Sequence, residues 1–142
     1  METSFIDEWF EYANIDLSTA EFLLSMRPMP MEIICYHCQQ SAEKFLKGYL
    51  ISKDILEPPK THNLILLHTM CIENDNRFNE ISRACEALNR YGVQPRYPNE
   101  MEIIGADVQK AILYAQSIRN CEIFTELQHQ LHPDSGEINK GK

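Results

Sequence analysis

The stretch CYHCQQSAEKFLK, residues 35–47, decides the fold, because the two faces of the helix that it predicts carry different chemistry. Small and apolar side chains recur at three- and four-residue steps on one face, as in an amphipathic helix. They are Ile34, Cys38, Ala42, Phe45 and Tyr49. A second face has the same steps but is polar or positively charged, and carries His37, Gln40, Lys44 and Lys47. A buried helix with such a polar stripe needs solvent, a partner subunit or an anionic ligand beside it.

Proline-rich breaks at residues 27–30 and 57–60 flank this helix, because proline and the residue before it disfavour helical backbone. Outward from these breaks, we expect five helices, over about residues 5–26, 31–53, 62–73, 77–91 and 99–128, with Thr61 as the N-cap of the third. The stripe of the first contains Phe5, Trp9, Tyr12, Ala13, Asp16, Leu17, Ala20 and Leu24. No segment alternates as a strand would. The sequence therefore predicts an all-α domain, an up-and-down bundle of four to five helices.

A chain of 142 residues fits one domain, which we expect over residues 1–128, followed by a polar, disordered tail at 129–142. The net charge of −8 opposes nonspecific binding of nucleic acid but leaves room for a local basic site. No apolar run could span a bilayer and no signal-peptide pattern is present, so we expect a cytoplasmic protein without membrane contact.

Five cysteines, mixed with apolar neighbours, predict buried reduced thiols, and neither a metal nor a cofactor is expected. The pair Cys35 and Cys38 lacks the second pair of ligands that a zinc site needs.

Three further features are candidates for a site. Asp16 lies on the stripe of the first helix, where it either pairs with a cation from another helix, such as Lys44 or Arg96, or occupies the rim. Lys60-Thr61-His62 joins a cation to a helix N-terminus, which either attracts an anion or simply caps the helix. Between two prolines, Arg96 and Tyr97 either offer a guanidinium to phosphate and a ring to a base, or form a rigid turn.

In order along residues 5–127, four motifs resemble the HEPN domain family (higher eukaryotes and prokaryotes nucleotide-binding). They are the Trp9–Ala13–Asp16–Ala20 stripe, the 35–47 helix, Lys60-Thr61-His62-Asn63-Leu64, and Arg96-Tyr97-Pro98. The resemblance implies a helical bundle that commonly dimerises, an association with RNA or nucleotides, and often a partner nucleotidyltransferase in a toxin–antitoxin pair.

Many HEPN proteins are metal-independent ribonucleases with an Arg-x4-6-His motif, and this chain departs from it. Arg96 matches the arginine, but Met101, Glu102 and Ile103 stand where the histidine would be. The resemblance therefore favours a nucleotide-, RNA- or partner-binding domain without efficient catalysis. We expect the binding residues to be His37, Lys44, Lys47, Lys60, His62, Arg96 and Tyr97, oriented by Asp16. Two alternatives stay open: a ribonuclease that uses Arg96 with His37 or His62, and a pure protein-interaction module.

Overall fold

The computed structural model describes residues 3–55, 60–92 and 102–133, and these ranges contain helices and no strand. The α-helices are α1 (Thr3–Leu23), α2 (Met31–Ser52), α3 (Leu64–Asn74), α4 (Ser82–Asn89), α5 (Gly105–Arg119) and α6 (Glu122–Leu131), and a 3-10 helix, η1 (Asn76–Ile81), precedes α4. The predicted all-α class is confirmed. None of the helices in the described ranges is both long and apolar enough to cross a membrane.

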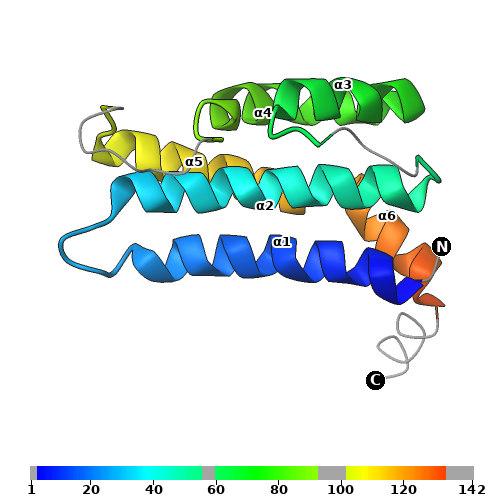
Figure 1. Ribbon diagram of the computed structural model, residues 1–142, viewed down its shortest axis with the longest axis horizontal. Coiled ribbons are helices and arrows are strands. Elements are labelled where there is room, and N and C mark those ends of the chain that lie inside the picture. Colours follow the sequence, from blue (N-terminus) through cyan, green and yellow to red (C-terminus); the bar gives the residue numbers. More distant parts are fainter. Residues whose placement is uncertain (1–2, 56–59, 93–101, 134–142) are drawn as a thin grey trace.

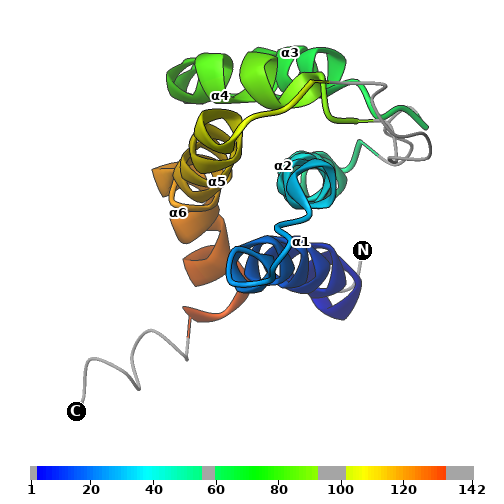
Figure 2. The same ribbon diagram turned by 90° about the vertical axis from the view of Figure 1, so that its left-hand side faces the viewer.

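Helix α2 occupies the centre of the bundle (Figures 1 and 2). It contacts α1, α3, α4 and α5. Viewed end-on in Figure 2, α1 lies below α2, the α3–α4 layer lies above it, and α5 runs along a third side.

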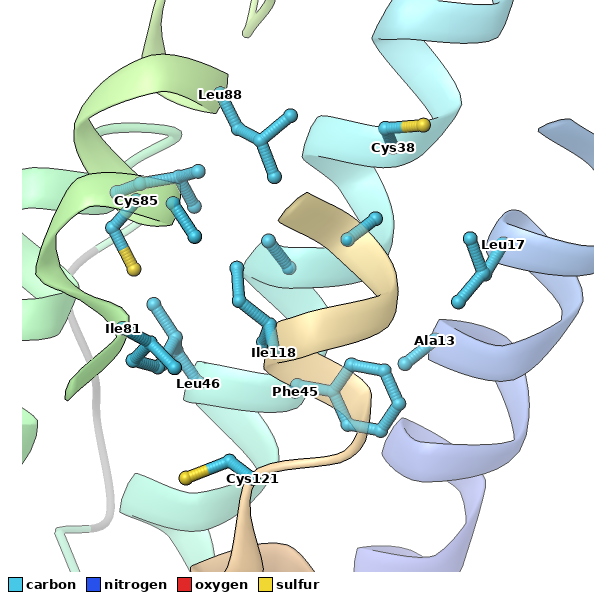
Figure 3. Packing of buried hydrophobic residues seen from close by; sticks show 14 of the residues in the cluster. Ala13, Leu17, Cys38, Phe45, Leu46, Ile81, Cys85, Leu88, Ile118 and Cys121 are labelled. Carbon is cyan, nitrogen blue, oxygen red and sulfur yellow. The ribbon is translucent and has the colours of Figure 1, made fainter. Parts of the chain in front are cut away.

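The predicted apolar face of α2 forms the middle of the core. Ile34, Cys38, Ala42, Phe45 and Tyr49 are all buried. In Figure 3, residues of α2 face Ala13 and Leu17 of α1 and Ile118 of α5. The periodicity of this stretch therefore identified the buried face of the central helix correctly.

Gly48 allows α1 and α2 to approach closely. A Cβ atom placed on Gly48 would lie 2.9 Å from Cε1 of Phe10 and 3.1 Å from Cβ of Trp9, which is closer than van der Waals contact. Because Gly48 has no side chain, the N-terminal half of α1 packs directly on the backbone of α2.

Several predicted helix boundaries were wrong. The segment expected as one helix over 77–91 is η1 followed by α4, and the long last helix is divided at Asn120 and Cys121. Cys121 has ψ 132°, an extended backbone that starts α6 in a new direction. Asn63, rather than Thr61, caps α3, because its Oδ1 accepts from the N–H groups of Ile65 at 2.9 Å and Leu66 at 3.3 Å.

The predicted stripe of α1 was partly wrong. Phe5 and Tyr12 are exposed and Trp9 is half-buried, whereas Ile6 and Phe10 are buried at the same end of the helix. Both sets have helical spacing, so the sequence alone did not show which of them meets α2. Ala13, Leu17 and Ala20 are buried as predicted, and belong to the same face as Ile6 and Phe10. They are joined by Asp16, whose carboxylate is described next.

Candidate functional site

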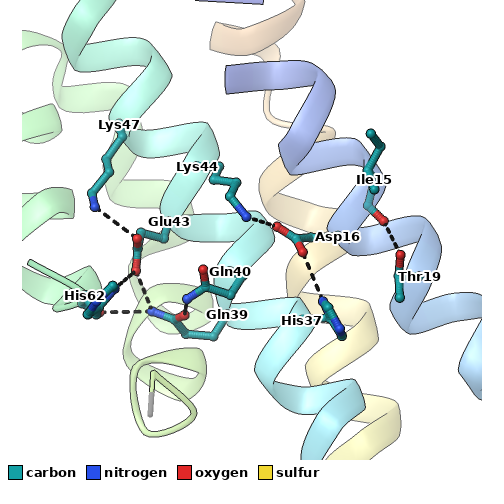
Figure 4. A network of polar contacts seen from close by, with 10 residues as sticks. All are labelled: Ile15, Asp16, Thr19, His37, Gln39, Gln40, Glu43, Lys44, Lys47 and His62. Carbon is teal, nitrogen blue, oxygen red and sulfur yellow. Dashed lines mark hydrogen bonds and ion pairs between the residues drawn. The ribbon is translucent and has the colours of Figure 1, made fainter. Parts of the chain in front are cut away.

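The polar face of α2 contains two buried carboxylates, each held between a lysine and a histidine (Figure 4). One carboxylate, Asp16, comes from α1, and the other, Glu43, from α2 itself. Because an isolated buried carboxylate is costly, both positions depend on their cationic or hydrogen-bonding neighbours.

The first cluster joins α1 to α2. Oδ1 of Asp16 lies 3.0 Å from Nδ1 of His37, and Oδ2 accepts a hydrogen bond from the ammonium of Lys44. His37 and Lys44 are seven residues apart, two turns of the same helix, so they lie on one face of α2 and both reach Asp16. The predicted pairing of Asp16 with Lys44 is present.

The second cluster joins α2 to the segment before α3. Glu43, only 4% exposed, accepts from Nζ of Lys47 at 3.0 Å and lies 2.9 Å from Nδ1 of His62. The amide of Gln39 donates to the carbonyl of His62 at 2.9 Å and approaches Oε1 of Glu43 at 3.4 Å. Gln40 in turn donates to Oε1 of Gln39 at 2.8 Å. This network fixes both the ring and the backbone of His62.

Sequence reasoning missed Glu43. One signal was available, because a glutamate four residues before a lysine is a favourable pair on a helix, and Glu43 and Lys47 have this spacing. No local signal relates Glu43 to His62, since the two meet only after the chain has left α2 and returned to start α3.

The two histidines share one geometry. Each directs Nδ1 at a carboxylate, and neither Nε2 atom has a hydrogen-bond partner among the described residues. A carboxylate acceptor favours a proton on Nδ1, which leaves Nε2 able to accept a proton or, in the imidazolium, to donate one. The side chain of His62 is 70% exposed and that of His37 27%, so His62 is the more accessible.

The charges of the two clusters balance. Two carboxylates meet two lysines, so the four charged side chains sum to zero, and protonation of the histidines adds positive charge. Each ammonium has three N–H donors and uses one of them on its carboxylate. The remaining ammonium donors, joined by the Nε2–H of each histidine when its ring is an imidazolium, can bind an anion.

The other predicted residues are placed as follows. Lys60 is exposed and lies two residues before His62, at the start of the described segment that leads into α3. Arg96 and Tyr97 lie outside the described residues. The structure therefore brings His37, Lys44, Lys47 and His62 to one face of α2 (Figure 4).

The cysteines have no part in this face. Burial raises the pKa of Cys35 to about 11 and that of Cys38 further, so both thiols are protonated near neutral pH and poor as nucleophiles or metal ligands. In residues 3–55, 60–92 and 102–133, no group of three or more His, Cys, Asp or Glu side chains could hold a metal ion.

The fold and site define an α-helical bundle whose central helix carries paired carboxylate, histidine and lysine groups. A family model described as the HEPN domain matches residues 6–125, so the chain belongs to the HEPN domain family, which is generally related to nucleotides and RNA. The match extends from α1 into α6. No curated protein and no solved structure matches the chain.

Proposed function

We propose that the polar face of α2 binds the phosphate of a nucleotide or of RNA, without efficient catalysis. The observation that carries this proposal is the pair of clusters, in which buried carboxylates orient Lys44, Lys47, His37 and His62 on one face. Membership of the HEPN family agrees with this class of ligand.

Charge-assisted hydrogen bonds to phosphate oxygens would supply the affinity. The lysine side chains are already held by Asp16 and Glu43, so less conformational entropy is lost when they meet an anion. Because the clusters balance their own charge, the face does not attract polyanions from a distance, which suits a chain with a net charge of −8. The polar face of α2 is thus a local site of fixed donors.

The test is calorimetric titration of AMP and a short single-stranded RNA into the wild type, Lys44→Gln/Lys47→Gln and Arg96→Ala. We expect the double variant to bind about tenfold or more weakly, and its affinity to depend less on salt, because two phosphate contacts are lost. Lys110→Gln, an exposed lysine of α5, is the matched control and should bind as the wild type does. Absent binding, or equal binding by wild type and double variant, would refute the proposal.

The accessible Nε2 of His62 favours one second candidate, a metal-independent ribonuclease that uses Arg96 with His62 or His37. In that reaction a 2′-hydroxyl attacks the adjacent phosphate to form a 2′,3′-cyclic phosphate, and the bond to the 5′-oxygen of the next nucleotide breaks. Imidazole takes the proton of the 2′-hydroxyl and gives one to the leaving 5′-oxygen, while the guanidinium stabilises the charge that develops on the phosphate. RNA incubated with the protein in EDTA should then be cleaved, and His62→Ala or His37→Ala should abolish cleavage. Intact RNA at micromolar protein would eliminate this candidate.

We further propose that the outer face of α1, defined by Ile15 and Phe22, contacts a second copy of the chain. These side chains are exposed, Phe22 to 77%, on the side of α1 opposite its core residues, and apolar surface of this kind is typical of interfaces. Light scattering during size-exclusion chromatography should give a dimer for the wild type and a monomer for Phe22→Glu.

A monomeric wild type would leave the same face for another protein. The resemblance described above makes a nucleotidyltransferase of a toxin–antitoxin pair the first partner to test, by co-purification with the product of the neighbouring gene. Co-purification without any binding of nucleotide or RNA would favour a pure interaction module.

A further inference from the structure

A shallow pocket adjoins the first cluster on the side of α1. Its volume is about 330 Å³, and its walls are Phe5, Glu8, Trp9, Tyr12 and Lys44. This volume is at the lower end of the range for small-molecule sites. Lys44 belongs both to this pocket and to the cluster with Asp16.

Three of the walls are aromatic because of helical spacing. Phe5, Trp9 and Tyr12 follow one another at steps of four and three residues, so they lie on one face of α1. Phe5 and Tyr12 are exposed, whereas Trp9 is half-buried and its Cβ packs where Gly48 leaves room on α2. The pocket therefore has one anchored ring and two accessible ones.

This arrangement separates two kinds of chemistry around one side chain. On one side of Lys44 are Asp16 and His37, and the ammonium of Lys44 uses one of its three donors on Asp16 and keeps two for an anion. On the other side are aromatic rings, whose faces stack on planar groups. A nucleotide has both parts, a phosphate and a base, joined by a sugar.

We infer that the aromatic pocket receives the base of the nucleotide whose phosphate is held on the polar face of α2, an inference that rests on the function proposed above. The ligand class is a nucleoside monophosphate unit, either free or within single-stranded RNA. Bases inside a duplex are already stacked on one another and cannot enter. Stacking on aromatic rings accepts every base, so the pocket supplies affinity and little sequence preference.

The chain carries its own reporter, because Trp9 is its only tryptophan. We expect AMP and single-stranded oligoadenylate to quench the fluorescence of Trp9 in a saturable manner, with N-acetyltryptophanamide as the control for light absorbed by the nucleotide. Ribose 5-phosphate, which lacks the base, should bind about tenfold more weakly and leave the fluorescence unchanged. If the oligonucleotide binds more tightly than AMP, the pocket is assigned to RNA. If the two bind equally, the pocket is assigned to a free nucleotide.

Variants separate stacking from phosphate binding. Tyr12→Ala and Phe5→Ala should each weaken AMP binding about five- to tenfold without changing the affinity for ribose 5-phosphate. Tyr12→Phe, which keeps the ring, should restore binding of AMP. Leu113→Ala removes an exposed apolar side chain of α5 and should have no effect. Circular dichroism checks that each variant is folded, which we expect because both aromatic positions are exposed.

These experiments distinguish a failure of the proposed phosphate binding from a failure of the base pocket alone. If calorimetry detects no binding of AMP, of the oligonucleotide or of ribose 5-phosphate, both the proposed function and the base pocket are refuted. If AMP binds no better than ribose 5-phosphate, or if Trp9 and the Tyr12→Ala variant do not respond, the base pocket alone is refuted and phosphate binding stands.

Discussion

Asp16 and Glu43 determine how the polar face of α2 is held together. Each is buried and takes one lysine and one histidine as partners. A buried ion pair adds little net stability by itself, but removal of one member leaves the other charge without compensation. The two carboxylates are therefore best understood as groups that position the cations.

We expect Glu43→Gln to lower the free energy of unfolding by about 1–3 kcal/mol, because Lys47 and His62 lose the buried charge that they share. Urea denaturation at neutral pH measures the loss. Glu126→Gln is the matched control, since Glu126 pairs with Arg77 at an exposed position and should matter less. An effect of Glu43→Gln no larger than the control would contradict the positioning role.

The same residues show how far sequence reasoning extends. The link between Asp16 and Lys44 was predictable, because a charge on a buried stripe needs a cation and the neighbouring helix supplied one. His62 was predicted as a site residue, but its contact with Glu43 depends on the path between α2 and α3, for which no local pattern exists. The roles of Arg96 and Tyr97 remain predictions, because both residues lie outside the described ranges.

At the scale of elements, α2 matched its prediction within one residue, Met31–Ser52 against 31–53, because prolines flank it on both sides. The division between α5 and α6 was not predicted. Neither proline nor glycine marks Asn120 and Cys121, and the apolar pattern continues through them. Breaks without such residues arise from tertiary packing, which periodicity does not encode.

The contact of α1 with α2 depends on the absence of a side chain at Gly48. Gly48→Ala should lower the free energy of unfolding by about 1–3 kcal/mol, because the new methyl group overlaps the ring of Phe10. Gly105→Ala at the start of α5 is the matched control. No atom lies within 4 Å of its added Cβ, so it should be neutral or stabilise by up to about 1 kcal/mol. Thermal and urea denaturation measure the change in the free energy of unfolding for each variant. The two changes should have opposite signs, or the loss for Gly48→Ala should be clearly larger.

The whole molecule should lose stability in alkaline solution. Burial raises the pKa of Cys35 and Cys121 to about 11 and of Cys85 to about 12, from an ordinary value of 9.0. The unfolded chain releases these protons at lower pH than the folded one, so ionisation favours unfolding. The thiols should add no pH dependence below about pH 8, and stability should fall as the pH rises from about 9 to about 11, by up to about 1.4 kcal/mol per thiol and pH unit.

Urea denaturation at a series of pH values measures this slope. Cys85→Ala should reduce it, because one ionising group is removed. A free energy of unfolding that stays constant up to about pH 10.5 would contradict the burial of the thiols in solution.

The central position of α2 has a consequence for recognition. A helix that contacts α1, α3, α4 and α5 opens only when most of the bundle opens, so its backbone belongs to the least mobile part of the protein. His37, Lys44 and Lys47 of the candidate site stand on this helix and are oriented before any ligand arrives. Association therefore requires little induced fit, and a ligand gains affinity because it need not order the surface that receives it.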